Sequence, residues 1–177
     1  MGKRSEFERN PRDYYPTPLK AVQPLVPHLP KQFTYAEPCA GDGRLVSHIK
    51  TLINGSDCLI KSDIEPQAPD IIKASAFNQN YDQVSLIITN PPWARPILHD
   101  MIEYFSRQAP TWLLFDLDWC ATDQSEPFMK YCEKIVVVGR VKWIEGSKKT
   151  GKDNCAWYLF DQSFDGETTF HSKTLIK

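Results

Sequence analysis

Two consecutive prolines after an apolar run restrict the fold of this chain more than any other feature. Residues 84–88 are mostly aliphatic, and a run of this length predicts a buried strand. Pro91 and Pro92 can continue neither a strand ladder nor a helix, so the strand has to end at Asn90. Pro91 also biases Asn90 toward an extended conformation. Asn90-Pro91-Pro92-Trp93 is therefore predicted to be a stiff polar cluster at the carboxyl end of a central strand, where open α/β folds place their chemistry.

The other apolar segments alternate between strand and helix patterns. Strands are predicted over residues 33–36, 58–62, 70–73, 112–115 and 134–138, and helices over residues 19–23, 44–52 and 97–107. Residues 140–144 and 156–160 also have strand patterns with no helical pattern between them, so they are predicted to pair antiparallel. Residues 116–128 show no regular pattern. This order predicts an α/β fold with a mostly parallel sheet covered by helices.

The composition is that of an ordinary soluble protein. The chain has 177 residues, of which 41% are hydrophobic and 24% are charged, and its apolar runs are too short to span a membrane. We expect a mobile polar arm over residues 1–13 and one domain over residues 14–177. The five cysteines form no Cys-x-x-Cys pair, which indicates reduced thiols and a cytoplasmic protein, and we expect no metal site and no targeting signal.

A glycine-containing loop follows the first predicted strand. Glu37-Pro38-Cys39-Ala40-Gly41-Asp42-Gly43 has two glycines that allow a ligand to approach the backbone closely. Asp63 ends the next predicted strand, 20 residues after Gly43, where a carboxylate can accept hydrogen bonds from both ribose hydroxyls. Glu37 and Asp42 would place two negative charges against a pyrophosphate, so a dinucleotide fits poorly. A cationic adenosine ligand fits better, and we expect S-adenosylmethionine, although these carboxylates could also serve only as turn caps.

Asn90 indicates the type of reaction. An exocyclic amine on an aromatic base is a weak nucleophile because its lone pair is delocalised into the ring. The side-chain carbonyl of Asn90 and the backbone carbonyl of Pro91 can each accept one amine hydrogen, which favours the pyramidal amine and stabilises the positive charge that develops during attack. No strong general base is then required. Trp93 offers a face on which a base can stack, worth about 1–3 kcal/mol.

Together these motifs resemble a known family. The chain is similar to S-adenosylmethionine-dependent DNA methyltransferases that act on the N6 amine of adenine, of the gamma order, in which the cofactor motifs precede the catalytic tetrapeptide. The similarity covers most of the chain and is to small bacteriophage enzymes. It implies a class I, Rossmann-like methyltransferase fold with a seven-stranded sheet whose last strand is antiparallel. Residues 14–177 would form one catalytic domain without a separate target-recognition domain, located in the bacterial host cell if a phage encodes it.

The resemblance also assigns roles to residues. It implies that Thr17 contacts the methionine carboxylate, Glu37 and Gly41 its ammonium region, and Asp63 the ribose. The segment that would border the cofactor adenine departs from the family pattern, since Ser75 or Ala76 stands where an acid is common. The cofactor residues implied in this way are Tyr15, Thr17, Glu37, Pro38, Gly41, Gly43, Asp63, Ile64, Ala76 and Phe77, and the catalytic residues are Asn90, Pro91, Pro92 and Trp93.

A basic segment, residues 140–152, is the candidate for contact with DNA. It contains five Lys or Arg residues against one Glu, an excess of four positive charges in a chain whose net charge is −1. A phosphate backbone needs such an excess, but a solvated charge run is an equal alternative. The resemblance places Trp143 where the family often offers an aromatic ring to the flipped base, and a position in the core is an equal alternative for it. The candidate nucleic-acid-binding residues are Lys142, Trp143, Lys148, Lys149 and Lys152.

Two alternative functions remain open at this point. The same chemistry on RNA adenine or on a protein glutamine is the first, although the glutamine enzymes mostly carry Tyr after the prolines and a different glycine loop. A catalytically silent cofactor-binding or DNA-binding module is the second, and the intact Asn90-Pro91-Pro92-Trp93 beside Asp63 argues against it. For the DNA enzyme, only residues 116–128 and 148–152 could touch the duplex, so we expect short or relaxed sequence specificity.

Overall fold

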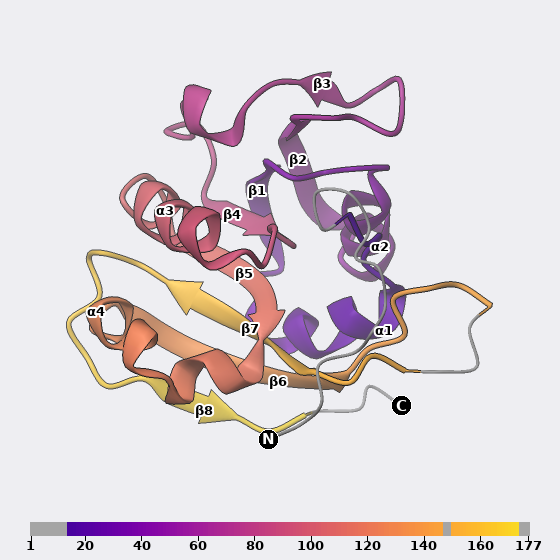
Figure 1. Ribbon diagram of the computed structural model, residues 1–177. Helices are drawn as coiled ribbons and strands as arrows, with labels where there is room; N and C mark the ends of the chain where they lie inside the picture. The colour runs from indigo at the N-terminus through magenta and orange to yellow at the C-terminus, as the bar shows by residue number, and fades with distance from the viewer. Residues whose placement is uncertain (1–13, 147–149, 174–177) are drawn as a thin grey trace.

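The predicted central strand is β4 (Leu86–Thr89), and all four of its residues are buried. It ends one residue before Asn90, as the two prolines require. The computed structural model describes residues 14–146 and 150–173, so the arm expected at residues 1–13 lies outside the described residues. Within them, eight strands form one sheet in the order β3-β2-β1-β4-β5-β7-β6-β8 (Figure 1).

Most of the predicted elements are confirmed, and the helix predicted over residues 44–52 has those bounds. The other strands are β1 (Gln32–Glu37), β2 (Gly55–Asp63), β3 (Ile72–Lys73), β5 (Thr111–Asp116), β6 (Cys132–Arg140), β7 (Asn154–Phe160) and β8 (Thr169–His171). The α-helices are α1 (Leu19–Val22), α2 (Arg44–Leu52), α3 (Arg95–Ser106) and α4 (Glu126–Met129). Short 3-10 helices are η2 (Gln23–His28), η3 (Ala76–Asn78), η4 (Leu117–Ala121) and η5 (Asp123–Ser125).

The strand directions agree with the predicted sheet except at its edge. β1, β2, β3, β4 and β5 are parallel, and β7 pairs antiparallel with both β5 and β6. The predicted number of seven strands is wrong by one, because the three-residue strand β8 pairs parallel with β6 at the edge of the sheet. A strand of this length is too short to leave a pattern in the sequence.

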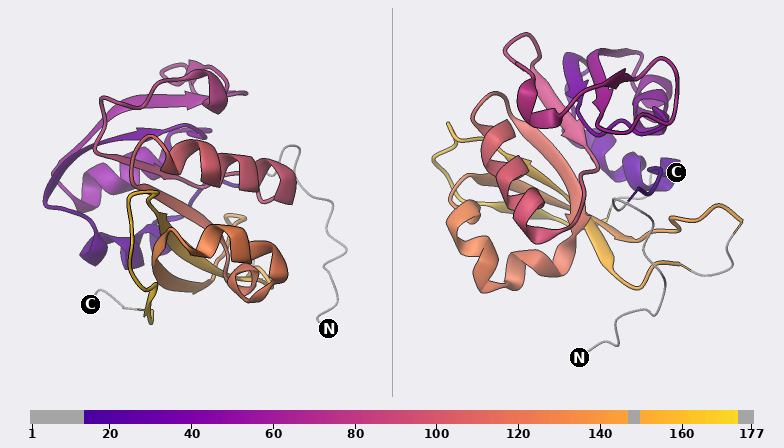
Figure 2. Two further views of the ribbon diagram at one scale, coloured as in Figure 1. Left: turned by 90° about the vertical axis from the view of Figure 1, so that its left-hand side faces the viewer. Right: turned by 45° about the horizontal axis from the view of Figure 1, so that its top comes forward.

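Helices cover both faces of the sheet (Figures 1 and 2). Strand β5 contributes buried side chains to the cores on both faces of the sheet. Trp112 and Leu114 belong to the core beneath α1 and α2, whereas Leu113 and Phe115 belong to the core beneath α3 and η4. Successive side chains of a strand point to opposite faces, so a strand covered on both sides is apolar throughout.

Two predictions for the C-terminal half need correction. Residues 140–144 were predicted to form a strand, but β6 ends at Arg140, and Trp143 leaves the sheet to contact Trp93 and Tyr15. Residues 116–128, predicted to be irregular, contain η4, η5 and the start of α4. Buried Trp119 and Phe128 hold these short helices on the sheet, so their order depends on tertiary packing rather than on local sequence.

The five cysteines all lie within the described residues, and none of them forms a disulfide. In that same part of the chain, no helix has both the length and the apolar character needed to cross a membrane.

Candidate active site

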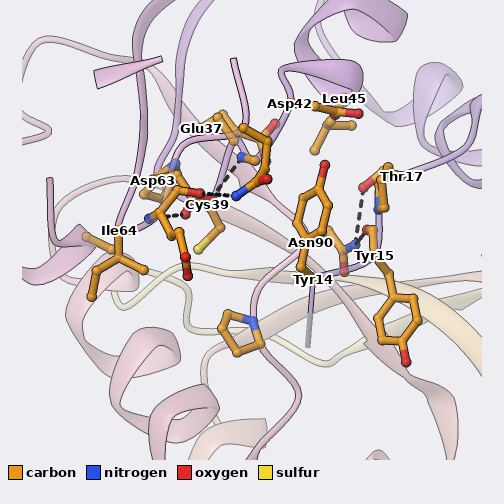
Figure 3. A pocket seen from close by; sticks show the side chains of 18 of the residues that line it. Tyr14, Tyr15, Thr17, Glu37, Cys39, Asp42, Leu45, Asp63, Ile64 and Asn90 are labelled. Carbon is orange, nitrogen blue, oxygen red and sulfur yellow. Dashed lines mark hydrogen bonds between the residues drawn. The ribbon is translucent and has the colours of Figure 1, made fainter. Parts of the chain in front are cut away.

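A cavity of about 500 Å³ opens at the carboxyl edge of the sheet, where β1, β2 and β4 end (Figure 3). Its walls come from the loops after these three strands, from η3, from α3 and from the N-terminal segment, residues 14–17. Parallel strands bring their carboxyl ends to the same edge, so polar groups far apart in the sequence meet here. The lining includes Tyr15, Thr17, Glu37, Pro38, Gly41, Asp63, Ile64, Ala76, Phe77, Asn90 and Pro92 among the residues predicted from sequence.

Gly41 and Gly43 shape the first wall of the cavity. Their φ angles are 53° and 77°, in the left-handed region that glycine adopts without strain. Gly41 lines the cavity, and a Cβ on this residue would lie only 2.6 Å from Cε2 of Tyr14. Gly43 instead leads the chain into α2 and does not line the cavity. Gly41 therefore allows Tyr14 to pack closely against the backbone, and Gly43 provides the turn into α2.

Glu37 is the most unusual group in the cavity, because its carboxyl group is buried and only partly satisfied. The residue is 1% exposed, and its Oε1 accepts a hydrogen bond from the Thr89 hydroxyl at 3.1 Å. Its Oε2 has no hydrogen-bond partner within the described part of the chain. Burial raises the pKa of Glu37 well above its usual value, against the opposing effect of the Thr89 hydrogen bond. An acidic group held in this way suits a ligand that brings both a positive charge and hydrogen-bond donors.

Asp63 stands at the end of β2, next to the glycine loop. Its Oδ2 accepts a hydrogen bond from the Gly41 N–H at 2.9 Å, and its Oδ1 accepts one from the Glu65 N–H at 2.8 Å. A carboxylate offers about four acceptor positions, so Asp63 can accept two further hydrogen bonds from a ligand. The backbone thus fixes the carboxylate without using up its acceptor capacity.

Apolar side chains form the far end of the cavity. Ile64 lines it and is 57% exposed, which is unusual for an isoleucine beside a buried sheet. Ala76 and Phe77, from η3, line the cavity as well. A flat apolar ring can be held between such groups.

The side chain of Asn90 is held by the N-terminal segment. Its Nδ2 donates to the Tyr15 carbonyl oxygen at 3.2 Å and to the Thr17 hydroxyl oxygen at 3.2 Å (Figure 3). The Tyr15 carbonyl can only accept, so this contact identifies which side of the amide is the nitrogen. The Oδ1 of Asn90 is 3.4 Å from Nε1 of Trp93, which also donates to the Leu114 carbonyl at 3.1 Å. The Asn90 carbonyl therefore keeps acceptor capacity for a substrate.

Trp93 does not line this cavity. It packs against the cores on both faces of the sheet and meets Trp143 edge to face, with ring centroids 5.7 Å apart. Trp143 also approaches Tyr15, with a centroid distance of 6.3 Å. These three rings form an aromatic cluster beside Asn90. Trp143 is half-buried and packs against the core on one face of the sheet.

The basic segment leaves the sheet at the same edge as Asn90. β6 and β5 are both antiparallel to β7, so β6 ends at the edge where β4 ends. Arg140, Lys142 and Lys152 are exposed, whereas Lys148 and Lys149 lie outside the described residues. Figure 1 shows the chain after β6 extending away from the sheet. Exposed cations thus flank the aromatic cluster.

Several cavity residues were missed by the sequence analysis. Tyr14 points into the cavity from the N-terminal segment, and both its burial and the nearby Asp42 carboxylate raise its pKa (Figure 3). Glu65 and Gln67 reach the cavity because the Gln67 N–H donates to the Gly41 carbonyl at 2.8 Å. Proximity to Asp63 in the sequence could have indicated Glu65. Tyr14 gives no such signal, because only the folded chain brings it to Gly41.

Across residues 14–146 and 150–173, no group of three or more His, Cys, Asp or Glu side chains could hold a metal ion.

Comparison with known proteins gives structural matches only. No protein-family model matches the sequence, and no curated protein matches it either. A protein from Vibrio vulnificus, assigned as the modification subunit of a type I restriction enzyme, matches with a TM-score of 0.58 at 13% identity, over 93% of this chain and 48% of that one. The chain thus spans about half the length of that subunit.

Two further solved structures resemble the chain at similar identity. A dimethyladenosine transferase from Plasmodium falciparum has a TM-score of 0.52 at 13% identity, over 85% of this chain and 63% of that one. A tRNA (m1A58) methyltransferase from Aquifex aeolicus has a TM-score of 0.51 at 13% identity, over 88% of this chain and 72% of that one. The chain has the class I methyltransferase fold. The fold class predicted from the sequence is therefore confirmed.

Proposed function

We propose that this protein transfers a methyl group from S-adenosylmethionine to the N6 amine of adenine in DNA, as a small gamma-order enzyme of the kind that bacteriophages encode. The observation that carries this proposal is the anchored amide of Asn90. Its nitrogen is bound by Tyr15 and Thr17, and its carbonyl keeps acceptor capacity at the wall of the cavity. A carbonyl acceptor in that place suits an amine donor. One structural neighbour is named a dimethyladenosine transferase, which is consistent with an adenine base as the acceptor.

The cavity residues fit S-adenosylmethionine as the cofactor. When bound, this cofactor would supply an electrophilic methyl group on a sulfonium. The unpartnered Oε2 of Glu37 can accept a hydrogen bond from the methionine ammonium, and Asp63 keeps acceptor positions for the ribose hydroxyls. Ile64, Ala76 and Phe77 provide the apolar surface that an adenine ring needs. The family resemblance assigns the methionine carboxylate to Thr17.

The residues at the end of β4 would perform the chemical step. Asn90 Oδ1 and the Pro91 carbonyl each accept one hydrogen of the target amine, and they stabilise the positive charge that forms on N6 as its lone pair attacks the methyl carbon. The cofactor would supply the methyl group to N6 and leave as a neutral thioether, and the proton that N6 then loses would pass to solvent. The Asn90 acceptor is positioned before the reaction, because the N-terminal segment fixes the amide. Pro91 and Pro92 stiffen the backbone beside it, and Pro91 itself is buried and does not line the cavity.

Methylation of a ring carbon is a less suitable reaction for this site. Carbon methylation of a pyrimidine needs a nucleophile that first attacks the ring, usually a thiolate. Cys39 lines the cavity, but burial raises the pKa of its thiol, so the group stays protonated near neutral pH. An exocyclic amine needs no such nucleophile.

The basic segment supports a nucleic acid as the substrate. Arg140, Lys142 and Lys152 are exposed at the edge of the sheet that carries Asn90, and exposed cations can bind backbone phosphates. An adenine has to leave the duplex to reach Asn90, and the aromatic cluster of Tyr15, Trp93 and Trp143 offers ring surfaces for it. The segment formed by η4 and η5 is a poorer contact for DNA, because its exposed Asp118 and Asp123 would repel phosphates.

Short or relaxed sequence specificity follows from this arrangement. The described surface near Asn90 offers few elements that could read base edges over several base pairs. Sequencing of DNA from cells that express the protein should show methylated adenines in a very short context. A long, unique recognition sequence would contradict this expectation.

Transfer of labelled methyl groups to unmethylated DNA, RNA and protein, measured in parallel, tests which polymer is the substrate. We expect label in DNA with the wild-type chain, and a loss of label with Asn90→Ala. Label in RNA alone would retain the chemistry and overturn DNA as the substrate. Label in protein alone, or in none of the three while S-adenosylmethionine binds, would overturn the proposed function.

A further inference from the structure

We infer that Thr17 is a positioning residue for Asn90, because its hydroxyl oxygen holds the amide nitrogen and so fixes the side chain whose carbonyl oxygen meets the substrate. This inference rests on the proposed function, because it concerns how that site selects an amine. The family resemblance gives Thr17 only a contact with the cofactor. The hydrogen bonds of this structure add a second partner, which is the catalytic amide.

The first step concerns the two hydrogens of the Asn90 amide nitrogen. One partner is the Tyr15 carbonyl and the other is the Thr17 hydroxyl oxygen, each at 3.2 Å from Nδ2. A primary amide has two N–H donors, so both are used within the protein. The nitrogen side of Asn90 thus faces the N-terminal segment, and only the oxygen side is left for a ligand.

The second step concerns the alternative orientation of the amide. Rotation by 180° would place Asn90 Oδ1 against the Tyr15 carbonyl oxygen and Nδ2 against the Trp93 indole N–H, so that two acceptors face each other and two donors do the same. The Thr17 hydroxyl could donate to the rotated Oδ1 only when its hydrogen is not already given to another acceptor. The loss of two ordinary hydrogen bonds lowers the population of that orientation by roughly 30-fold. Thr17 adds a third contact, which holds the nitrogen in place when the Thr17 hydrogen is donated elsewhere. A rotated amide would present N–H donors and would suit a carbonyl on the base instead of an amine.

The third step concerns the rigidity of Thr17 itself. The residue is 4% exposed and lies between Pro16 and Pro18, whose rings restrict the backbone on both sides. Downstream, the Trp157 indole N–H donates to the Ala21 carbonyl at 2.8 Å and so attaches α1 to β7. Upstream, the Tyr14 ring packs against Gly41. The hydroxyl is therefore delivered by a segment that is held at both ends.

The fourth step concerns the hydrogen of the Thr17 hydroxyl. A hydroxyl oxygen can accept from Asn90 and donate its own hydrogen at the same time. The methionine carboxylate that the resemblance assigns to Thr17 is a suitable acceptor for that hydrogen. One side chain would then contact both the cofactor and the catalytic amide, and hydrogen bonds in such a chain strengthen one another.

The test compares Thr17→Val, which keeps the shape but lacks the acceptor, with Thr17→Ser, which keeps the acceptor. Turnover is measured at saturating S-adenosylmethionine and DNA, cofactor affinity by calorimetry, and folding by melting temperature. We expect Thr17→Val to lower turnover about tenfold and cofactor affinity by a smaller factor, and Thr17→Ser to restore both. In an Asn90→Ala background, Thr17→Val should lower turnover no further, because the group that it positions is gone.

A second measurement needs no enzymatic activity, and its first comparison uses only the wild-type protein. In the wild-type protein, the side-chain amide hydrogens of Asn90 should exchange with solvent more slowly than those of the exposed Asn80, as followed by NMR. Thr17→Val should accelerate this exchange, and Thr17→Ser should not.

Three results would overturn the inference: unchanged turnover of Thr17→Val at saturating cofactor, an equal further loss in the Asn90→Ala background, or Asn90 exchange as fast as that of Asn80. A failure of the proposed function looks different. In that case the wild-type protein methylates no adenine in DNA, while the slow exchange of Asn90 persists.

Discussion

The cavity and the basic segment lie at the same edge of the sheet, but they are built in opposite ways. The cavity is acidic and recessed into the edge of the sheet, and hydrogen bonds from the backbone fix its groups, as at Asp63. The basic segment is exposed and is held by the ring contacts of Trp143 and by an ion pair of Arg44 with Glu145, which is 90% exposed at its side chain. An ion pair so exposed contributes little stability. The comparison teaches that backbone hydrogen bonds fix the groups of the cavity, whereas exposed side-chain contacts hold the basic segment.

Asn90 lies at the boundary between these two regions, and its replacement should have the largest effect. We expect Asn90→Ala to lower turnover by about 10²–10³-fold, because it removes an acceptor that acts on the transition state. Cofactor affinity should change by less than about threefold, since the cavity carboxylates remain. Steady-state kinetics and calorimetry measure both. Asn80→Ala, at an exposed site, is the control; if Asn90→Ala turned over equally fast, the division between the two regions would be wrong.

Glu37→Gln tests the acidic side of the comparison and should have the next largest effect. Loss of the charge should weaken S-adenosylmethionine binding by about tenfold or more, because a charge-assisted hydrogen bond is replaced by a neutral one. Exposed Glu126→Gln should leave this affinity unchanged. Equal affinity of Glu37→Gln and wild type in calorimetry would show that the buried carboxyl group does not hold the cofactor.

The same variant also has a pH signature without ligand. Burial raises the pKa of Glu37 in the folded chain, so the carboxyl group destabilises the fold as pH rises from about 4.5, its ordinary pKa, toward that higher value. Glu37→Gln should therefore melt at a higher temperature than wild type at pH 7, and this difference should shrink toward pH 4.5. A lower melting temperature for the variant at pH 7 would contradict this account of the burial.

Replacement of the basic side chains tests the other region. A triple variant should raise the KM for DNA about tenfold; its substitutions are Arg140→Gln, Lys142→Gln and Lys152→Gln. The slope of log binding constant against log salt concentration should also become less steep, by up to about three. Cofactor affinity should stay the same. Lys31→Gln, exposed at the opposite edge of the sheet beside the start of β1, is the matched control. An unchanged salt dependence in the triple variant would leave the basic segment as a merely solvated surface.

The smallest expected effect concerns a hydrogen bond between α3 and η4. The buried Trp119 donates its indole N–H to Nε2 of His99 at 3.1 Å, so His99 has to be neutral at that nitrogen. Burial, aided by Arg95, lowers the pKa of His99, and the unfolded chain therefore binds this proton more readily. Stability should fall as pH drops below about 6.5.

His99→Gln isolates this contribution, because Gln can accept the indole hydrogen bond without titrating. Between pH 7.5 and 5.5, the melting temperature of wild type should fall by a few degrees more than that of His99→Gln. His28 and His48, whose pKa values burial also lowers, remain in both proteins and act as the internal reference. An identical acid response of variant and wild type would show that His99 does not contribute.

The elements around the cavity were predicted from sequence more accurately than the segment that contains Trp143, and the reason is physical. Glycine and proline punctuate the chain at Gly41, Gly43 and Pro91, so the ends of strands and the start of α2 could be placed from local rules. Residues 140–144 were predicted to form a strand because Val141, Trp143 and Ile144 are apolar. The position of Trp143 outside the sheet depends on contacts with Tyr15 and Trp93, which are distant in the sequence.

The candidate site shows the same limit. Glu37, Asp63 and Asn90 could be named because each ends a strand, and the parallel sheet then brings them to one cavity. The hydrogen bonds from Asn90 to the N-terminal segment span more than 70 residues of chain, and no local pattern encodes them. β8, with three residues, was missed because its pairing with β6 defines it rather than any run of its own.

The most direct test of the proposed reaction identifies the atom that receives the methyl group. DNA is incubated with the wild-type protein and S-adenosylmethionine carrying a deuterated methyl group, digested to nucleosides, and analysed by mass spectrometry. The proposal predicts deuterated N6-methyladenine as the product, and its near absence with Asn90→Ala. A deuterated methylcytosine, or no labelled nucleoside from a protein that binds the cofactor, would contradict it.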